Sequence, residues 1–471
     1  MPLILPGNVG SATAATGFNV ANSVRFQNAQ LGRTSSSTSA TNIDKYTISV
    51  WVKRSKLGAD QNIISLRASS YYQIYFKSDD TIRWQEYLGG SSKELITNRK
   101  FRDVGAWYNL IFRYDSSLGT AGDRMRMYVN GVEETSFATD SNPAQNTNGH
   151  FGVASTLSVI GDDNGDGREY FGYMCEFMGV DGQSLAPTEF GEFDSDNGIW
   201  KPIDISGITQ GVHGFYLKFE DSSNLGVATL GSNWTGAGLA ATDQSTDTCT
   251  NNFATWNSLQ PTNAAMSEGN LVGASSASSG HYSGISSIGV SSGKWYFECK
   301  QTQESTANEG MIGVIIFYNT ITALLNPVGR GGGWGMQDGN RGFSTDSGGS
   351  GSTTDNFHAG WTDDDIIGIA LDIDNSRVYY SKNGSWNNSG SWNAANPTTS
   401  QTLQNALGDG TYFFMAGDAS GSNNCTWSAN FGSPAHAISS GNTDGNGYGN
   451  FEYAVPSGYF SLNTKNLAKY G

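Results

Sequence analysis

The alternation of bulky and small side chains between Thr362 and Trp386 predicts the centre of an antiparallel sheet. The bulky set is Ile367, Ile369, Leu371 and Ile373, and the small or polar set is Gly368, Ala370 and Asp372. Successive side chains of a strand point to opposite faces, so we expect this strand to be packed on both sides. Asp374-Asn375-Ser376 and Asn383-Gly384 then predict tight turns, which gives a three-strand meander with Trp386 on its third strand.

A period of two also runs through the first half of the chain. It is clearest in residues 45–54 (KYTISVWVKR), 107–115 (WYNLIFRYD) and 125–129, the last followed by the turn Asn130-Gly131. Shorter apolar runs at residues 63–66, 72–77 and 81–85 predict further strands. The best helical candidates are short, Pro187–Phe193 and Ser400–Leu407. With 61 glycines and only 15% charged residues among 471, the chain is predicted to be all-β with many turns.

The second half resembles a SPRY domain. Along the chain, the matching segments are Gly293–Glu298 (GKWYFE), Gly332–Gly335 (GGWG), Asp365–Asp372 (DIIGIALD), Tyr380–Gly384 (YSKNG) and Asn430–Gly432 (NFG). This is the order in which the corresponding strands occur in that family. The resemblance implies an antiparallel β-sandwich used for recognition, and it implies no activity.

The first half resembles laminin-G-like and pentraxin-like domains. The segments that carry the likeness are the two predicted strands that contain tryptophan (residues 45–54 and 107–115), the hairpin at Asn130-Gly131, Ser158–Gly161 and Tyr170–Met174. This resemblance implies a concanavalin A-like jelly roll. Together the two halves predict an all-β fold of two tandem antiparallel β-sandwich domains.

We divide the chain into five predicted parts. These are a docking arm (residues 1–21), a laminin-G-like sandwich (22–220), a Ser/Asn/Gly-rich joining region (221–290), a SPRY-like sandwich (291–433) and a tail (434–471). Segments 251–257 (NNFATWN), 267–271 (SEGNL) and 455–471 (VPSGYFSLNTKNLAKYG) resemble structural proteins of marine tailed phages. That resemblance implies a homo-oligomeric virion component, with a trimer expected from the class, whose partners are other virion proteins.

The net charge of −16 bears on partners and location. A nucleic-acid binder needs a basic surface, and none is visible in the sequence, so we expect no nucleic-acid partner. The apolar run 311–318 is too short to span a bilayer, so we expect no membrane insertion. The start of the chain lacks a signal-peptide pattern, and the four cysteines are too far apart in sequence to predict a zinc site.

One segment resembles the first half of a calcium-binding loop. Asp162, Asn164 and Asp166 place oxygen ligands at alternate positions before Gly167. The competing interpretation is an ordinary β-turn, because Asp, Asn and Gly also favour turns. Asn442, Asp444 and Asn446 repeat the spacing with less charge. Calcium is therefore a candidate ligand and no other cofactor is expected.

Tryptophans among amide side chains form the candidate sugar site. Trp386 and Trp392 lie in KNGSWNNSGSWNAANP, where an exposed ring could stack on a sugar and the amides could bind its hydroxyls. Trp334, in GRGGGWGMQDG, lies on the binding-face strand implied by the SPRY resemblance. The alternative is that these rings fill the sandwich core.

No catalytic pattern is found in the sequence. Glycanases of this architecture pair two carboxylates across the scissile bond, and residues 176–181 (EFMGVD) have the wrong spacing. We therefore expect a non-enzymatic virion protein, assembled in the host cytoplasm and exposed on the particle. As a fibre, tail or capsid-surface appendage it would contribute to attachment to host glycans. The alternatives are a capsid decoration protein without a host ligand and a polysaccharide-degrading enzyme.

Overall fold

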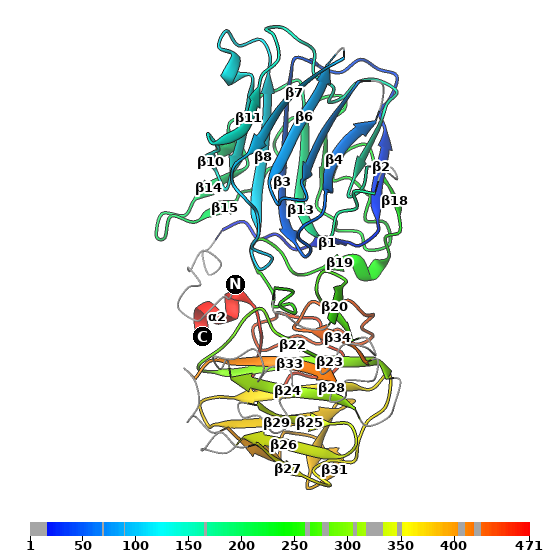
Figure 1. Ribbon diagram of the computed structural model, residues 1–471, viewed down its shortest axis with the longest axis vertical. Coiled ribbons are helices and arrows are strands. Elements are labelled where there is room, and N and C mark those ends of the chain that lie inside the picture. The colour runs from blue at the N-terminus through cyan, green and yellow to red at the C-terminus, as the bar shows by residue number, and fades with distance from the viewer. Residues whose placement is uncertain are drawn as a thin grey trace. The chain divides into compact units, whose positions relative to one another are not determined.

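The computed structural model divides into two compact units, one within Ala15–Thr250 and the other within Asn251–Gly471. The structure describes residues 17–67, 70–88, 90–163, 167–259, 264–275, 282–304, 309–316, 333–345, 351–403, 410–418 and 425–471. Each unit is built from two large sheets (Figure 1). The all-β prediction is confirmed, and in the described residues no helix is long and apolar enough to cross a membrane.

In the first unit the larger sheet carries the order β10-β9-β8-β3-β13-β1-β19, and β16 and β17 continue it beside β13. The bounds are β1 (Ser23–Phe26), β3 (Lys45–Arg54), β8 (Tyr108–Asp115), β9 (Met125–Val129), β10 (Val132–Glu133), β13 (Gly172–Asp181), β16 (Phe215–Leu217), β17 (Leu230–Gly231) and β19 (Gln244–Ser245).

The facing sheet of the first unit has the order β11-β7-β6-β5-β4-β12-β2-β18. The bounds are β2 (Gln30–Thr34), β4 (Gln61–Arg67), β5 (Tyr71–Phe76), β6 (Ile82–Leu88), β7 (Ser91–Thr97), β11 (Phe137–Ser141), β12 (Leu157–Ile160) and β18 (Thr235–Ala237). The inward residues of both sheets, among them Ile48, Phe112, Ile74 and Trp84, form one buried core. A small hairpin, β14 (Gly191–Phe193) and β15 (Trp200–Pro202), completes the unit.

In the second unit one sheet has the order β20-β21-β34-β23-β28-β29-β30-β31, with β32 beside β29 and β35 beside β23. The bounds are β20 (Ala264–Ser267), β21 (Val272–Ser275), β23 (Lys294–Glu304), β28 (Ile366–Asp372), β29 (Arg377–Lys382), β30 (Ser385–Asn388), β31 (Ser391–Ala394), β32 (Ser400–Thr402), β34 (Cys425–Asn430) and β35 (Phe460–Ser461).

The other sheet of the second unit has the order β22-β33-β24-β25-β26-β27. The bounds are β22 (Tyr282–Ile285), β24 (Gly310–Ile316), β25 (Gly333–Gln337), β26 (Arg341–Thr345), β27 (Gly351–Thr354) and β33 (Tyr412–Asp418). Phe297 and Ile369 of the first sheet share a buried core with Val314 and Phe414 of this one. The described pairings are antiparallel except that of β23 with β35.

The predicted meander is confirmed as β28, β29 and β30. Ile367, Ile369 and Leu371 face the central core, while Ala370 packs on the opposite side with Trp386. Asn383 and Gly384 close the second turn with φ values of 49° and 78°, a left-handed conformation that asparagine and glycine tolerate best.

The helical predictions were less successful. Pro187–Glu189 forms a single 3-10 turn that leads into β14, and Ser400–Thr402 is strand β32, held in register by β29. Residues 404–409 lie outside the described part of the chain. Helix α2 (Thr464–Tyr470) falls within the stretch predicted as a tail, and Asn463 caps it by accepting from the backbone N–H of Asn466 at 3.0 Å.

The division between the units lies after Thr250, inside the stretch predicted as a joining region. Residues on one side of it supply β17, β18 and β19 to the first unit, and residues on the other side supply β20, β21 and β22 to the second. The predicted tail likewise contributes β35 and buries Leu462 and Leu467 in the second core. Residues 1–16 of the predicted arm lie outside the described residues. Further along the arm, the backbone N–H of Val20 donates a hydrogen bond to Thr250 Oγ1 within the first unit.

Candidate functional site

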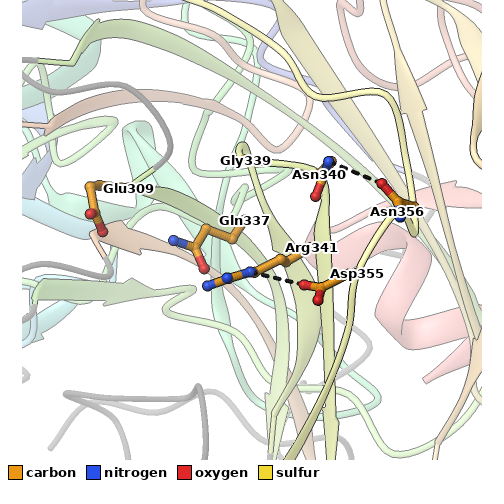
Figure 2. A pocket seen from close by; sticks show the side chains of 7 residues that line it. All are labelled: Glu309, Gln337, Gly339, Asn340, Arg341, Asp355 and Asn356. Atoms are coloured by element: carbon orange, nitrogen blue, oxygen red, sulfur yellow. Dashed lines mark hydrogen bonds and ion pairs between the residues drawn. The ribbon is translucent and has the colours of Figure 1, made fainter.

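A polar hollow of about 570 Å³ lies at the β25–β26 end of the second unit. It is lined by Glu309, Gln337, Gly339, Asn340, Arg341, Asp355 and Asn356, whose arrangement is shown in Figure 2. Three short segments supply these residues: the start of β24, the β25–β26 hairpin and the loop that follows β27. The lining carries amide, carboxylate and guanidinium groups, and none of the described residues that form it has a large apolar side chain.

The β25–β26 hairpin sets the floor of the hollow. Gln337 pairs with Arg341 at the end of the ladder, and Asn340 turns the chain with a φ of 75°. The backbone N–H of Asp338 donates to the carbonyl of Gly310 at 3.0 Å, which ties the turn to β24. Trp334 and Met336 point into the core, so the polar residues at the hairpin end remain outside it.

Two polar pairs orient the side chains of the hollow. Arg341 Nε donates to Asp355 Oδ1 at 3.0 Å, and Asn340 Nδ2 donates to Asn356 Oδ1 at 3.3 Å (Figure 2). The side chains of Arg341 and Asp355 are 56% and 70% exposed, so their ion pair contributes little to folding stability. Its effect is to hold a charged donor in a defined position at the surface of the hollow.

The loop bearing Asp355 and Asn356 is anchored by His358. The Nε2 of His358 donates to the carbonyl of Gln337 at 2.9 Å, and its Nδ1 accepts from the backbone N–H of Gly360 at 2.9 Å. Burial lowers the pKa of His358 to about 4, so the ring is neutral at neutral pH. The ring stacks on Trp361 with the centroids 5.1 Å apart.

The three tryptophans predicted for a sugar site do not form one surface. Trp334 is fully buried, and Trp386 is 4% exposed against Tyr296 and Phe451. The exposure expected for Trp386 is wrong, because the strand β30 turns its ring beneath residues 451–459. Trp392 is half-buried, and its Nε1 donates to the carbonyl of Gly360 at 3.0 Å.

The hairpin that carries Trp392 nevertheless borders the hollow. A Cβ at Gly390 would lie 3.1 Å from the carbonyl oxygen of Asn356, one of the lining residues. The predicted sugar site thus lies beside the hollow, but Asn340, Arg341 and Asp355 were not among the residues selected from the sequence. The polar turn QDGNR, directly after a buried strand, is a signal that could have found Asn340 and Arg341, whereas Asp355 comes from the separate loop after β27.

Of the predicted calcium ligands Asp162, Asn164 and Asp166, the structure describes only Asp162. Asp162 Oδ1 accepts from the backbone N–H of Asp163 at 2.6 Å, as in a local turn, while Asn164 and Asp166 lie outside the described residues. Arg168 pairs with Asp163 Oδ2 at 3.2 Å. Within the described ranges no cluster of three His, Cys, Asp or Glu side chains could hold a metal ion. Calcium at residues 162–166 stays a prediction.

The second calcium candidate is a structural anchor. Asp444 is 5% exposed, and its Oδ2 accepts from the backbone N–H of Ser461 at 3.0 Å and from Asn466 Nδ2 at 2.7 Å. Its Oδ1 accepts from the backbone N–H groups of Asn446 and Tyr448. The hydrogen bonds give Asp444 a structural role in this fold, and calcium at Asn442, Asp444 and Asn446 stays a prediction.

Comparison with known proteins identifies the class of the first unit. A family model described as the concanavalin A-like lectin/glucanases superfamily, of the laminin-G type, matches residues 26–183. Residues 26–183 of this all-β protein are therefore similar to a concanavalin A-like domain. No curated protein matches the chain.

Several solved structures are similar to parts of the chain. The SPRY domain of human HERC1 is 14% identical over 37% of this chain and 96% of that domain, with a TM-score of 0.29. A pentraxin from Limulus polyphemus is 19% identical over 36% of this chain and 80% of its own, with a TM-score of 0.26. Domains LG4-5 of mouse laminin alpha1 are 10% identical over 85% and 82% of the two chains, with a TM-score of 0.27.

Proposed function

We propose that the protein is a non-enzymatic carbohydrate-binding protein that takes part in adhesion, and that the polar hollow of the second unit holds the sugar. The observation that carries this proposal is the composition of the hollow, with Asn340, Asn356 and Gln337 around Arg341 and Asp355. The lectin-type family match of the first unit supports the same class of function.

The lining groups suit the hydroxyls of a sugar. Each hydroxyl both donates and accepts, and a side-chain amide offers both kinds of partner within one plane. Arg341 adds a charged donor that is fixed by Asp355, so part of the side-chain entropy is lost before a ligand binds. A shallow, polar site of this kind binds weakly, and repetition of the chain in an oligomer would raise the avidity.

More specifically, we propose that the protein is a surface appendage of a phage particle and attaches to host glycans. It is supported by the likeness of residues 251–257, 267–271 and 455–471 to phage structural proteins. Gold-labelled antibody against the chain on purified particles should mark the tail, the fibres or the head surface. Particles without label and without the chain in their proteome would contradict the virion assignment and leave the sugar-binding proposal standing.

Sugar binding is tested by screening the full chain on a glycan array, followed by calorimetry with each hit. Arg341→Ala should weaken binding about 10-fold or more, because the site loses a charged hydrogen bond. Asn340→Gly keeps the positive φ while it removes the amide, and should weaken binding roughly 3- to 10-fold.

The matched control is Arg377→Ala, which removes an arginine from β29 in the other sheet of the same unit. Its affinity should equal that of the wild type. An array without hits, or equal affinities for Arg341→Ala and Arg377→Ala, would contradict the assignment of the hollow.

A further inference from the structure

Two cysteines that are distant in sequence approach each other inside the first unit. The Sγ atoms of Cys175, on β13, and Cys249, after β19, lie 3.7 Å apart. Cys175 is fully buried and Cys249 is partly exposed at the edge of a cluster that contains Trp51, Trp107 and Trp200. Neither thiol takes part in the carbohydrate site proposed above.

The segment around Cys249 is held from several sides. Asp247 is 1% exposed, and its carboxylate accepts from Lys53 Nζ at 2.7 Å and from Trp107 Nε1 at 3.1 Å. At the next position, Thr248 Oγ1 donates to the carbonyl of Val20 at 3.0 Å. The backbone N–H of Val20 donates to Thr250 Oγ1 at 3.0 Å, so the chain is fixed on both sides of Cys249.

This anchoring keeps the two thiols facing each other. A disulfide needs an S–S distance of about 2.0 Å, so side-chain rotation has to close less than roughly 2 Å. β13 is a central strand, paired with β3 on one side and with β1 and β16 on the other, and cannot move away without breaking the sheet. The proximity of the thiols is therefore a fixed property of this fold.

We propose that Cys175 and Cys249 form a disulfide that fastens the end of the first unit to its central sheet. The reaction joins the two sulfur atoms and releases two protons and two electrons. A small-molecule disulfide such as oxidised glutathione accepts them and leaves as two thiols. The bond closes the loop from residue 175 to residue 249, which covers β14 to β19 and ends just before the division at Thr250.

Burial affects the rate of this reaction. It raises the pKa of the Cys249 thiol well above its ordinary value, so little thiolate is present in the folded protein. Oxidation of the folded chain should be slow, and oxidation during refolding should be faster because the thiols are then solvated. The same burial should protect the finished bond from reductants.

The test uses the full chain refolded with oxidised glutathione and, in parallel, with dithiothreitol. After denaturation the reduced sample should show all four thiols and the oxidised sample two, with an intact mass lower by two hydrogens. Digestion without reduction should give one linked species that joins the peptides containing Cys175 and Cys249. Oxidation should raise the Tm of the first unit by roughly 5–15 °C, because the unfolded chain is constrained.

Variants assign the bond. Cys249→Ser, at the partly exposed position, should abolish both the mass change and the Tm difference. The control Cys299→Ser/Cys425→Ser, in the second unit, should retain both. Four free thiols after oxidative refolding, a link between any other pair, or an unchanged Tm would overturn the proposal.

Discussion

Two buried carboxylates, Glu298 and Glu86, show how a single side chain organises polar groups in the interior of each unit. Glu298 is fully buried on β23 and accepts from the backbone N–H groups of Glu452 and Tyr453 at 2.9 Å, which fixes a distant segment to the sheet. Glu86 accepts from Tyr46 Oη at 2.5 Å inside the first core. Each carboxylate is paired, because an unpaired buried one would cost several kcal/mol.

Glu176 gives a pH prediction at this scale. It sits at a bulge of β13 with a φ of 48°, and Tyr216 donates to its carboxylate. Burial raises the pKa of Glu176 to about 7, so between about pH 4.5 and pH 7 the folded state binds the extra proton. This contribution to stability is full below about pH 4.5 and is lost as the pH rises through 7.

Glu176→Gln should therefore remove part of the stability lost on raising the pH from 5 to 8, on the order of 3 kcal/mol. Glutamine keeps the acceptor for Tyr216 and meets the same backbone strain, so the charge alone changes. Thermal unfolding of both proteins across this range measures the difference. Parallel pH profiles would show that Glu176 does not titrate there.

Single residues also show where sequence reasoning ends. The alternation of bulky and small residues is a local pattern, and it correctly predicted that Ile367 and Ile369 face the core. The burial of Trp386 is not local, because the residues that cover it come from positions 451–459. An asparagine-rich neighbourhood suggested exposure, yet Asn387 is fully buried and donates to the carbonyl of Phe357.

At the scale of elements, the loop after β27 carries two lining residues of the hollow and is held in place by the titratable side chain of His358. His358 needs a protonated Nε2 and a bare Nδ1 to satisfy Gln337 and Gly360 at once. Protonation of Nδ1 would direct an N–H at the N–H of Gly360. The pKa of about 4 reflects burial of the ring, which disfavours its charged form.

The folded pKa of His358 lies below the unfolded value near 6.5, so the unfolded state binds more protons between pH 6.5 and 4. The stability of the second unit should fall as the pH drops through this window, by up to about 3 kcal/mol. His358→Gln should be less stable at pH 7 and should lack this acid-dependent loss. Thermal unfolding of both proteins between pH 4 and 7.5 checks the prediction, and identical slopes would contradict it.

The segment after β34 is the second informative element. Asp444 collects Ser461, Asn466 and the turn at Asn446 around one carboxylate, which docks β35 and α2. Sequence reasoning read Asn442–Asn446 as a metal loop or a turn, because the partners of Asp444 lie about 20 residues further on. For the same reason, the packing of β35 and α2 against the second unit was not predicted for the tail segment.

Asp444→Ala should destabilise the second unit by about 2–4 kcal/mol, because several buried donors lose their acceptor. Hydrogen exchange should show lost protection across residues 460–470. Asn396→Ala, a change at an exposed loop position in the same unit, should leave both measurements unaltered. Retained protection in Asp444→Ala would show that Leu462 and Leu467 alone hold the segment.

At the scale of the whole molecule, each unit has its own core. The main core of the first draws on residues between Val24 and Leu239, and that of the second on residues between Ala254 and Tyr470. Strand patterning predicted two sandwiches but not the division after Thr250. The short strands β17 to β22 carry little alternation, and their placement is decided by the sheets that they join.

Calorimetry of the full chain should therefore show two unfolding transitions. Oxidation of Cys175 and Cys249 should move one of them, and Asp444→Ala should move the other, because the perturbed residues belong to different cores. A single transition that moves as a whole in both experiments would show that the units unfold together.

The closure of the second unit has a mechanical consequence. The backbone N–H of Asn252 donates to Thr464 Oγ1 at 3.0 Å, and Phe253 forms a bridge with Asn463, so residues 252–253 lie directly against residues 463–464. Tension applied across those two points would load this short contact before the sheets behind it. We expect the contact to open at low force while the sandwich and its hollow stay intact. An optical-tweezers record with a small first extension before the main rupture would show this sacrificial step.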